Sequence, residues 1–235
     1  MTDMERTDFA ALMHKVEELD FTLRLCIQDM GHGTTFIKHP LINTPYIPQM
    51  NAYNNALYHA KKKSLEEYEA AKNWDQAIWI HERPWRIEAF ERYAGFMEPD
   101  AAAKMLLDVW QDCEHPYSHR RLWLKLFDAY RSSTVLMTTA AHLLIEDAPP
   151  ITLYRGMGKA ESNKHYGMLG LSWTLDRPIA EWFAKRYRAL ARGAFVAEAQ
   201  VDVKGVLAYL PTRAEQEVII DPFYITAIKL TEVPK

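Results

Sequence analysis

Residues Glu215-Gln216-Glu217-Val218-Ile219-Ile220 place two carboxylates directly before a short apolar run. The apolar run is typical of a buried strand. Because side chains on a strand alternate between its faces, the two glutamates are expected to point the same way. Two like charges held together beside a core strand are costly unless a polar or ionic ligand needs them. Solvated Glu-x-Glu pairs are common, so this stretch gains its weight from the segments that precede it.

Two earlier stretches also join polar groups to apolar runs, residues 153–156 (Leu-Tyr-Arg-Gly) and 170–174 (Gly-Leu-Ser-Trp-Thr). Arg155 can present its fork of donors to phosphate or carboxylate, and Gly156 allows a ligand to approach the backbone. Ser172 and Thr174 are expected on one strand face, where their hydroxyls can position a carboxylate or a sugar. Singly, the three stretches have plain alternatives: a turn arginine, a polar strand face and solvated glutamates. Their order within 63 residues is harder to attribute to chance.

Composition indicates a globular chain of 235 residues with 49% hydrophobic residues and a net charge of -3, which gives no overall basic signature for nucleic acid. Residues 1–150 carry 16 Lys and Arg against 22 Asp and Glu, whereas residues 151–235 carry 12 against 9, which mildly suits an anionic ligand. Two cysteines fit a reducing compartment, and no apolar stretch approaches the ~20 residues of a membrane span. The charged start lacks the apolar core of a signal peptide, so we expect a cytoplasmic location.

The pattern along the chain changes after Pro150. Before it, apolar spacing predicts helices at 8–29, 84–96, 99–113, 118–131 and 134–146, and one or two helices over 51–82. A long loop is predicted at 31–50. After Pro150, six of the nine glycines and short β-rich runs appear, interrupted by one helix from Pro178 to about Arg192. The predicted strands are 151–154, 195–203, 206–210, 218–220 and 224–230. The fold class is therefore expected to be α+β, with a helical region at 1–150 and a compact β-rich core at 151–235.

The order of the three polar stretches resembles the R-S-E class of mono-ADP-ribosyltransferases. That class has an Arg on an early strand, a Ser-x-Ser/Thr strand and a Glu/Gln-x-Glu motif that leads into a late strand. The matching residues are Arg155 with Gly156, Ser172 with Thr174, and Glu215 with Glu217. The resemblance covers residues 151–230 and includes the helix after the Ser motif. It departs from the class in the short spacing of 17 residues between Arg155 and Ser172 and in Thr174 at the second hydroxyl position.

The resemblance implies an enzyme with an ADP-ribosyltransferase-like core that uses NAD as its substrate. It would cleave nicotinamide from the ribose and transfer ADP-ribose to a macromolecular acceptor without a metal. The oxocarbenium-like transition state would be stabilised by Glu217, which Ser172 would hold in its rotamer. Arg155 would grip a phosphate or ribose of NAD, and the Gly156 backbone would meet the nicotinamide amide. Glu215 would orient and deprotonate the acceptor, for which protein arginine is the first expectation and nucleic acid the second.

Further residues are expected near NAD or the acceptor, each with a plainer alternative. Thr174 would help to bind NAD, and Phe183 or Trp182 would stack on nicotinamide or adenine, with core packing as the alternative. Arg213 would touch the acceptor, with a solvated arginine as the alternative. The helix that carries Phe183 also has a basic face that can meet phosphate or lie in solvent: Lys185, Arg186, Arg188 and Arg192.

The helical region is expected to bind a partner or target, to complete the NAD cleft, or to receive a cognate inhibitor if the chain is an intracellular toxin or effector. Two other functions stay open: an NAD glycohydrolase with water as acceptor, and a non-enzymatic helical adaptor. Cys113, His115 and His119 have the residue types for zinc, but no fourth ligand is evident and Pro116 breaks a helix between them. We therefore expect no metal site.

Overall fold

The computed structural model describes residues 12, 15–145, 148–158, 170–191, 193–211 and 214–234, with the backbone alone at 187–191. Helices and strands are both present, which confirms the α+β class. The chain forms two compact units: unit 1 is Met1–Glu98 with Leu107–Glu114, and unit 2 is Pro99–Leu106 with His115–Lys235. Residue 150 therefore does not separate the units. The reason is that α7 (Arg120–Ala129) and α8 (Thr134–Ala140) pack against strand β7 (Val206–Leu210) of unit 2.

Unit 1 contains a three-stranded antiparallel sheet that the sequence did not predict. Its strands, in the order β1-β2-β3, are β1 (Ile27–Asp29), β2 (Thr35–His39) and β3 (Ile42–Pro45). The predicted loop at 31–50 is therefore wrong: Gly31 and Gly33 adopt φ of 82° and 76° and form the β1–β2 turn. The predicted helix at 8–29 is also wrong within the described residues of that range. The α-helix found there is the single turn α2 (Phe21–Arg24).

The segment before α2 is held against α3 (Asn51–Ala70) instead of continuing a helix. Asn55 donates from Nδ2 to the Glu18 carbonyl at 2.8 Å and accepts at Oδ1 from the Asp20 N–H at 2.7 Å. These bonds satisfy backbone groups that a helix would otherwise satisfy. Leu19 and Leu23 are then both buried in the core of unit 1. A contact between residues 35 positions apart thus overrides the local helical spacing.

Most of the expected helices are confirmed with shifted ends. The range 51–82 holds two helices, because Lys72 at φ 55° ends the first and Asn73 caps the next through a 3.3 Å bond to the Gln76 N–H. None of the described helices is long and apolar enough to cross a membrane. The remaining helices of this part of the chain are α4 (Trp74–Trp79), α5 (Arg86–Tyr93) and α6 (Pro99–Asp112).

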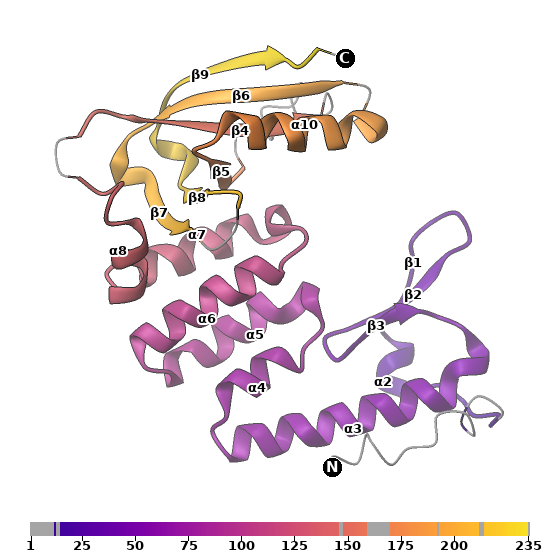
Figure 1. Ribbon diagram of the computed structural model, residues 1–235. Helices are drawn as coiled ribbons and strands as arrows, with labels where there is room; N and C mark the ends of the chain where they lie inside the picture. Colours follow the sequence, from indigo (N-terminus) through magenta and orange to yellow (C-terminus); the bar gives the residue numbers. More distant parts are fainter. Residues whose placement is uncertain are drawn as a thin grey trace. The chain divides into compact units, whose positions relative to one another are not determined.

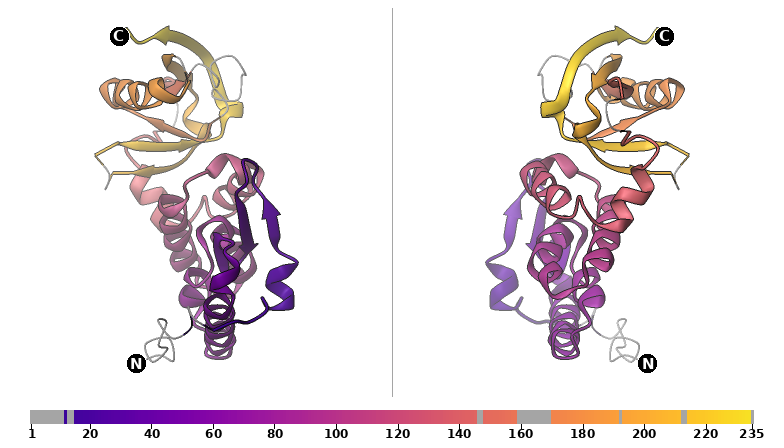
Figure 2. Two further views of the ribbon diagram at one scale, coloured as in Figure 1. Left: turned by 90° about the vertical axis from the view of Figure 1, so that its right-hand side faces the viewer. Right: turned by 90° about the vertical axis from the view of Figure 1, so that its left-hand side faces the viewer.

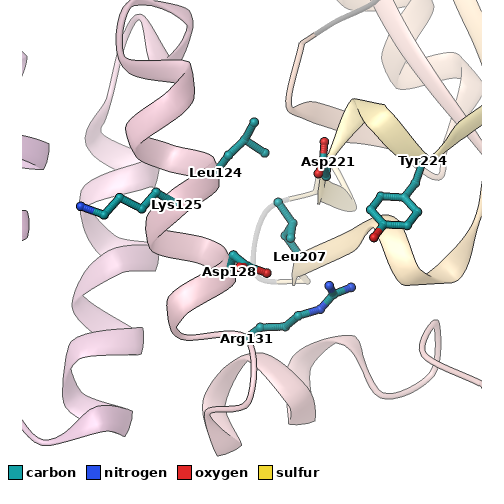
Figure 3. Close-up of a pocket in the computed structure, with 7 residues that line it drawn as sticks. All are labelled: Leu124, Lys125, Asp128, Arg131, Leu207, Asp221 and Tyr224. Carbon is teal, nitrogen blue, oxygen red and sulfur yellow. The ribbon is translucent and has the colours of Figure 1, made fainter.

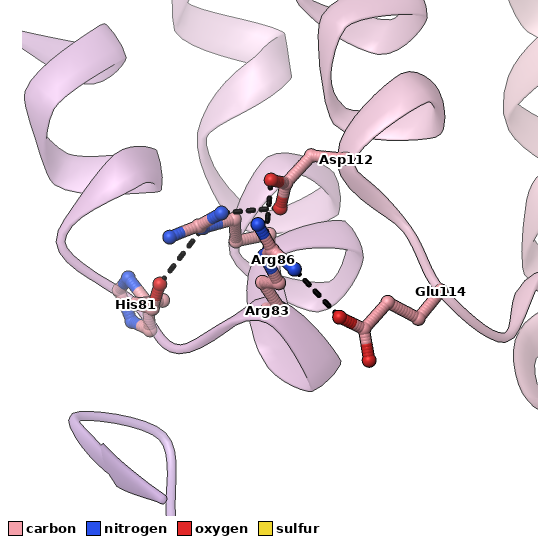
Figure 4. Close-up of polar contacts among 5 residues, drawn as sticks. All are labelled: His81, Arg83, Arg86, Asp112 and Glu114. Carbon is pink, nitrogen blue, oxygen red and sulfur yellow. Dashed lines mark hydrogen bonds and ion pairs between the residues drawn. The ribbon is translucent and has the colours of Figure 1, made fainter.

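An ion-pair network joins the start of α5 to the end of α6 within unit 1 (Figure 4). Asp112 pairs with Arg86 and, at 3.2 Å, with Arg83, which also reaches Glu114 at 2.6 Å. The Nε of Arg86 donates to the His81 carbonyl at 2.9 Å. Each charge in this cluster faces an opposite charge, and its bonds stay within the unit. We therefore assign it to the packing of unit 1 and not to ligand binding.

Histidine burial gives unit 1 a pH-dependent stability. Burial lowers the pKa of His81 and of His39 from the ordinary value, and the Leu41 N–H donates to the His39 Nδ1 at 3.1 Å, which a protonated Nδ1 cannot accept. A histidine with a lowered folded-state pKa costs nothing above about pH 6.5 and removes stability below it, because the unfolded chain then binds more protons.

We expect the urea midpoint of unfolding to fall between about pH 7.5 and about pH 5, and to fall less in His81→Gln. Glutamine can still donate to the Ala77 carbonyl, which lies 2.7 Å from the His81 Nδ1. The difference between the two midpoints reports the protonation of His81 together with the effect of its charge on His39, whose pKa it also lowers. An identical fall in the variant would contradict this prediction.

Unit 2 is organised around a six-stranded antiparallel sheet with the order β7-β8-β5-β4-β6-β9 (Figure 1). The strands predicted after Pro150 are confirmed, and β4 runs four residues beyond the predicted end at residue 154. Arg155 and Gly156 therefore lie inside a strand that pairs along its whole length with β6, and not in a turn. The strands are β4 (Ile151–Gly158), β5 (Ser172–Thr174), β6 (Ala194–Val201), β7 (Val206–Leu210), β8 (Glu217–Ile220) and β9 (Ile225–Glu232).

Each face of this sheet packs a different apolar cluster. One face buries Leu153, Met157 and Trp173 together with Val218 in the larger core. The other face is covered along β4 and β6 by α10 (Arg177–Ala191), as Figure 2 also shows. Small residues of α10 and β6 make that contact close, with Tyr154 packed at its margin. The predicted helix starting at Pro178 is thus confirmed within one residue of its observed start.

Candidate functional site

Ser172 and Glu217 meet across the β5–β8 pair. Ser172 pairs with Ile219 and Thr174 with Glu217, so the serine lies diagonally across from the glutamate on one face of the sheet. The Ser172 Oγ donates to the Glu217 Oε1 at 2.5 Å. Glu217 is only 6% exposed, whereas the serine is half-buried. A buried carboxylate is therefore fixed in orientation by a neighbouring hydroxyl.

Arg155 approaches the same serine from the strand on the other side of β5. Strands β4 and β5 share one register pair, Tyr154 with Thr174, whereas β4 and β6 pair along all of β4. Beyond that pair the side chain of Arg155 bridges the two strands, and its Nη1 donates to the Ser172 carbonyl at 2.8 Å. The three residues expected to form the site therefore lie on three adjacent strands, joined by two hydrogen bonds.

Thr174 holds the turn that leads into β8. Its Oγ1 donates to the Glu215 carbonyl at 2.6 Å and accepts from the Asp176 N–H at 3.0 Å, and the residue is 6% exposed. The hydroxyl thus ties the end of β5 to the backbone just before Glu217. Direct contact of Thr174 with NAD stays a prediction.

Glu215 does not share a strand with Glu217. Strand β8 begins at Glu217, and Gln216 between the two glutamates adopts φ 45°, in the left-handed region that non-glycine residues rarely occupy. We expected strand alternation to point both carboxylates the same way. That expectation is wrong in assuming that both glutamates lie on one strand. Glu215 belongs to a turn and is half-buried, and its backbone is held by Thr174.

Gly156 provides space for α10. A Cβ at this position would lie 2.1 Å from the Ala180 carbonyl oxygen, 2.6 Å from the Ala184 nitrogen and 2.8 Å from the Phe183 Cβ. The missing side chain thus serves helix packing, whereas we expected it to serve the approach of a ligand. Contact between the Gly156 backbone and nicotinamide stays a prediction, for which the strand edge that faces β5 is the available side.

The aromatic and basic residues of α10 are placed only in part. Phe183 is half-buried beside Gly156 and makes an edge contact with Trp182, which is 56% exposed and lies beneath Arg186. Lys185 and Arg186 are both exposed. The side chain of Arg188 and residues Arg192 and Arg213 lie outside the described part of the structure. Stacking of Phe183 or Trp182 on NAD stays a prediction.

The structure also brings in residues that sequence reasoning did not assign to the site. Gly170 lies against the guanidinium of Arg155, and the Trp173 indole donates to the Gly170 carbonyl at 2.7 Å. Arg177 joins α10 to the sheet through a 3.2 Å ion pair with Glu198 of β6, and it forms a second pair of 3.2 Å with Glu181 of its own helix. A glycine two residues before Ser172 was visible in the sequence, but nothing there indicated that an arginine 15 positions away would occupy its side-chain space.

A cavity of about 300 Å³ lies elsewhere in unit 2, between α7 and the β7 side of the sheet (Figure 3). Asp128, Arg131, Asp221 and Tyr224 are among its lining residues. Arg131 donates to the carbonyls of Lys204 and Val206, so its guanidinium is engaged in holding this part of the fold. Among the predicted site residues that the structure describes, none lines this cavity. Across the described residues, no group of three His, Cys, Asp or Glu is placed to hold a metal ion.

Comparisons with protein-family models, with curated proteins and with solved structures found no match to this chain. We therefore derive a function from the geometry of the candidate site itself.

Proposed function

We propose that this chain is an NAD-dependent mono-ADP-ribosyltransferase with its catalytic core in the sheet of unit 2. The observation that carries the proposal is the 2.5 Å bond from the Ser172 Oγ to the buried carboxylate of Glu217. The 2.8 Å bond from Arg155 to the Ser172 carbonyl adds the third residue of the motif set. Three residues from separate stretches of sequence thus lie on three adjacent strands, and their order along the chain is the one on which the R-S-E resemblance rests.

In the proposed reaction the bond between the ribose C1′ and the nicotinamide nitrogen breaks, and nicotinamide leaves as a neutral molecule with the bonding electrons. The ribose becomes oxocarbenium-like, and the carboxylate of Glu217 stabilises its positive charge. Ser172 keeps that carboxylate in one orientation, so little reorganisation is needed at the moment of reaction. Arg155 contributes a positive charge that suits the pyrophosphate of NAD.

The acceptor nucleophile then bonds to C1′ and transfers its proton to the carboxylate of Glu215. The turn around Gln216 separates this base from Glu217, so the two carboxylates serve different substrates. Thr174 stabilises the turn through the Glu215 carbonyl. A protein arginine is the proposed first acceptor, and a nucleic acid is the second.

The test uses two NAD preparations, one labelled in nicotinamide and one in the adenylate part, incubated with the full chain and a cell lysate. We expect release of labelled nicotinamide and transfer of the adenylate label to a macromolecule, with neither in Glu217→Ala. Protease or nuclease digestion of the labelled product then identifies the acceptor class.

Other outcomes decide between the alternatives. Nicotinamide release with free ADP-ribose and no labelled macromolecule would identify an NAD glycohydrolase. No nicotinamide release from the wild-type protein would exclude both enzymatic functions and favour the adaptor. We further propose that the N-terminal region binds the acceptor or an inhibitor, in a toxin or effector that acts in the cytoplasm. These roles depend on the transfer of the adenylate label to a macromolecule.

A further inference from the structure

Gly170 lies where a side chain would collide with the proposed NAD-binding arginine. A Cβ built at this position would lie 2.5 Å from the Arg155 Cζ, 2.6 Å from its Nε and 2.8 Å from its Nη2. All three atoms belong to the guanidinium group. The space that a side chain would occupy at residue 170 is therefore filled by the functional end of Arg155.

Gly170 is itself held in place from the core. The Trp173 indole, 2% exposed, donates from Nε1 to the Gly170 carbonyl at 2.7 Å. On its other side, the guanidinium of Arg155 donates to the Ser172 carbonyl at 2.8 Å, and Ser172 in turn binds Glu217. A series of contacts thus runs from the buried tryptophan through the glycine and the arginine to the serine that orients the carboxylate.

From this geometry we infer that Gly170 is a positioning residue for Arg155, an inference that rests on the proposed function. The colliding atoms lie at the far end of a flexible side chain, so an added methyl group is relieved by movement of Arg155. Gly170→Ala is therefore expected to keep the fold and to displace the guanidinium from the Ser172 carbonyl. Gly156 differs, because its neighbours include backbone atoms of α10.

The first experiment measures the position of Arg155 without reference to activity. Full-length wild-type protein and Gly170→Ala are treated with phenylglyoxal, which modifies accessible guanidinium groups, and labelling of the peptide containing Arg155 is followed by mass spectrometry. We expect roughly tenfold faster labelling in Gly170→Ala, because a bond from a charged donor holds the guanidinium by at least that factor. Gly95→Ala is the matched control, since its Cβ would meet no atom within 4 Å.

The second experiment measures the consequence for NAD. We expect kcat/KM for nicotinamide release to fall about 10- to 100-fold in Gly170→Ala, chiefly through KM. In an Arg155→Lys background, adding Gly170→Ala should lower kcat/KM by less than about twofold further, because the guanidinium that the alanine displaces is absent. Unchanged labelling, or an equal loss in both backgrounds, would overturn the inference while leaving the proposed function intact. Absence of nicotinamide release by the wild type would instead overturn the role in the reaction, whatever the labelling shows.

Discussion

Glu217→Gln is expected to lower the rate of nicotinamide release about 1,000-fold, which is the scale on which one preorganised electrostatic group stabilises a transition state. Glutamine has the shape of glutamate and can still accept the Ser172 hydroxyl bond through its own Oε1, so the strand pairing is retained. What it lacks is the negative charge that, in the proposed reaction, stabilises the developing cation of the ribose. The loss is therefore expected in kcat, with KM for NAD little changed.

Single-turnover measurement of nicotinamide release gives this rate directly, and the urea midpoint verifies the fold. Glu232→Gln is the matched control, because it removes a carboxylate from β9, the strand at the opposite edge of the sheet from β7 and β8. Release at the wild-type rate by Glu217→Gln would mean that this carboxylate does not stabilise the transition state. A comparable loss in Glu232→Gln would point to a general charge effect.

Gly156→Ala is expected to destabilise unit 2 by about 3 kcal/mol or more, at the upper end of the cost of overpacking a core. Its Cβ would lie 2.1 Å from the Ala180 carbonyl oxygen and 2.6 Å from the Ala184 nitrogen, and backbone atoms cannot rotate away. Helix α10 would have to separate from β4, which opens the cluster in which Ala180, Ala184 and Val196 are buried.

Urea unfolding followed by circular dichroism measures this cost. Gly95→Ala is expected to stay within about 0.5 kcal/mol of the wild type, as open positions do. Gly170→Ala serves as the second comparison, because its collision is with a mobile side chain, and it is expected to lie near the control. Equal stability of Gly156→Ala and the wild type would contradict the close packing of α10 on β4.

The strands of unit 2 and its helix α10 were predictable because each follows a local sequence pattern. Val218, Ile219 and Ile220 form an apolar run, and Pro178 suits the first turn of a helix. The N-terminal errors have the opposite cause. Leu19 and Leu23 have helical spacing, but Asn55 of a distant helix bonds the Glu18 carbonyl and the Asp20 N–H, which a continued helix would otherwise satisfy.

The candidate site residues were proposed from their order in the sequence, whereas their contacts could not be predicted from it. The bond from Ser172 to Glu217 depends on the register of β5 against β8, and a shift of one residue would turn the carboxylate to the opposite face. Likewise, the left-handed turn at Gln216 removes Glu215 from the strand, although the Glu-x-Glu pattern by itself predicts two glutamates on one face of a strand. Register and turn geometry follow from pairing between segments that are distant in sequence.

By itself, the sequence determined the α+β class, the late strands and the order Arg155, Ser172, Glu217, because these depend on residue type and local period. Only the tertiary structure showed that Gly156 leaves space for the close packing of α10 and that Gly170 leaves space for the guanidinium of Arg155. Both glycines look alike in a one-dimensional pattern. Their difference is steric, and it exists only once α10 and Arg155 have been brought against them by the folding of the sheet.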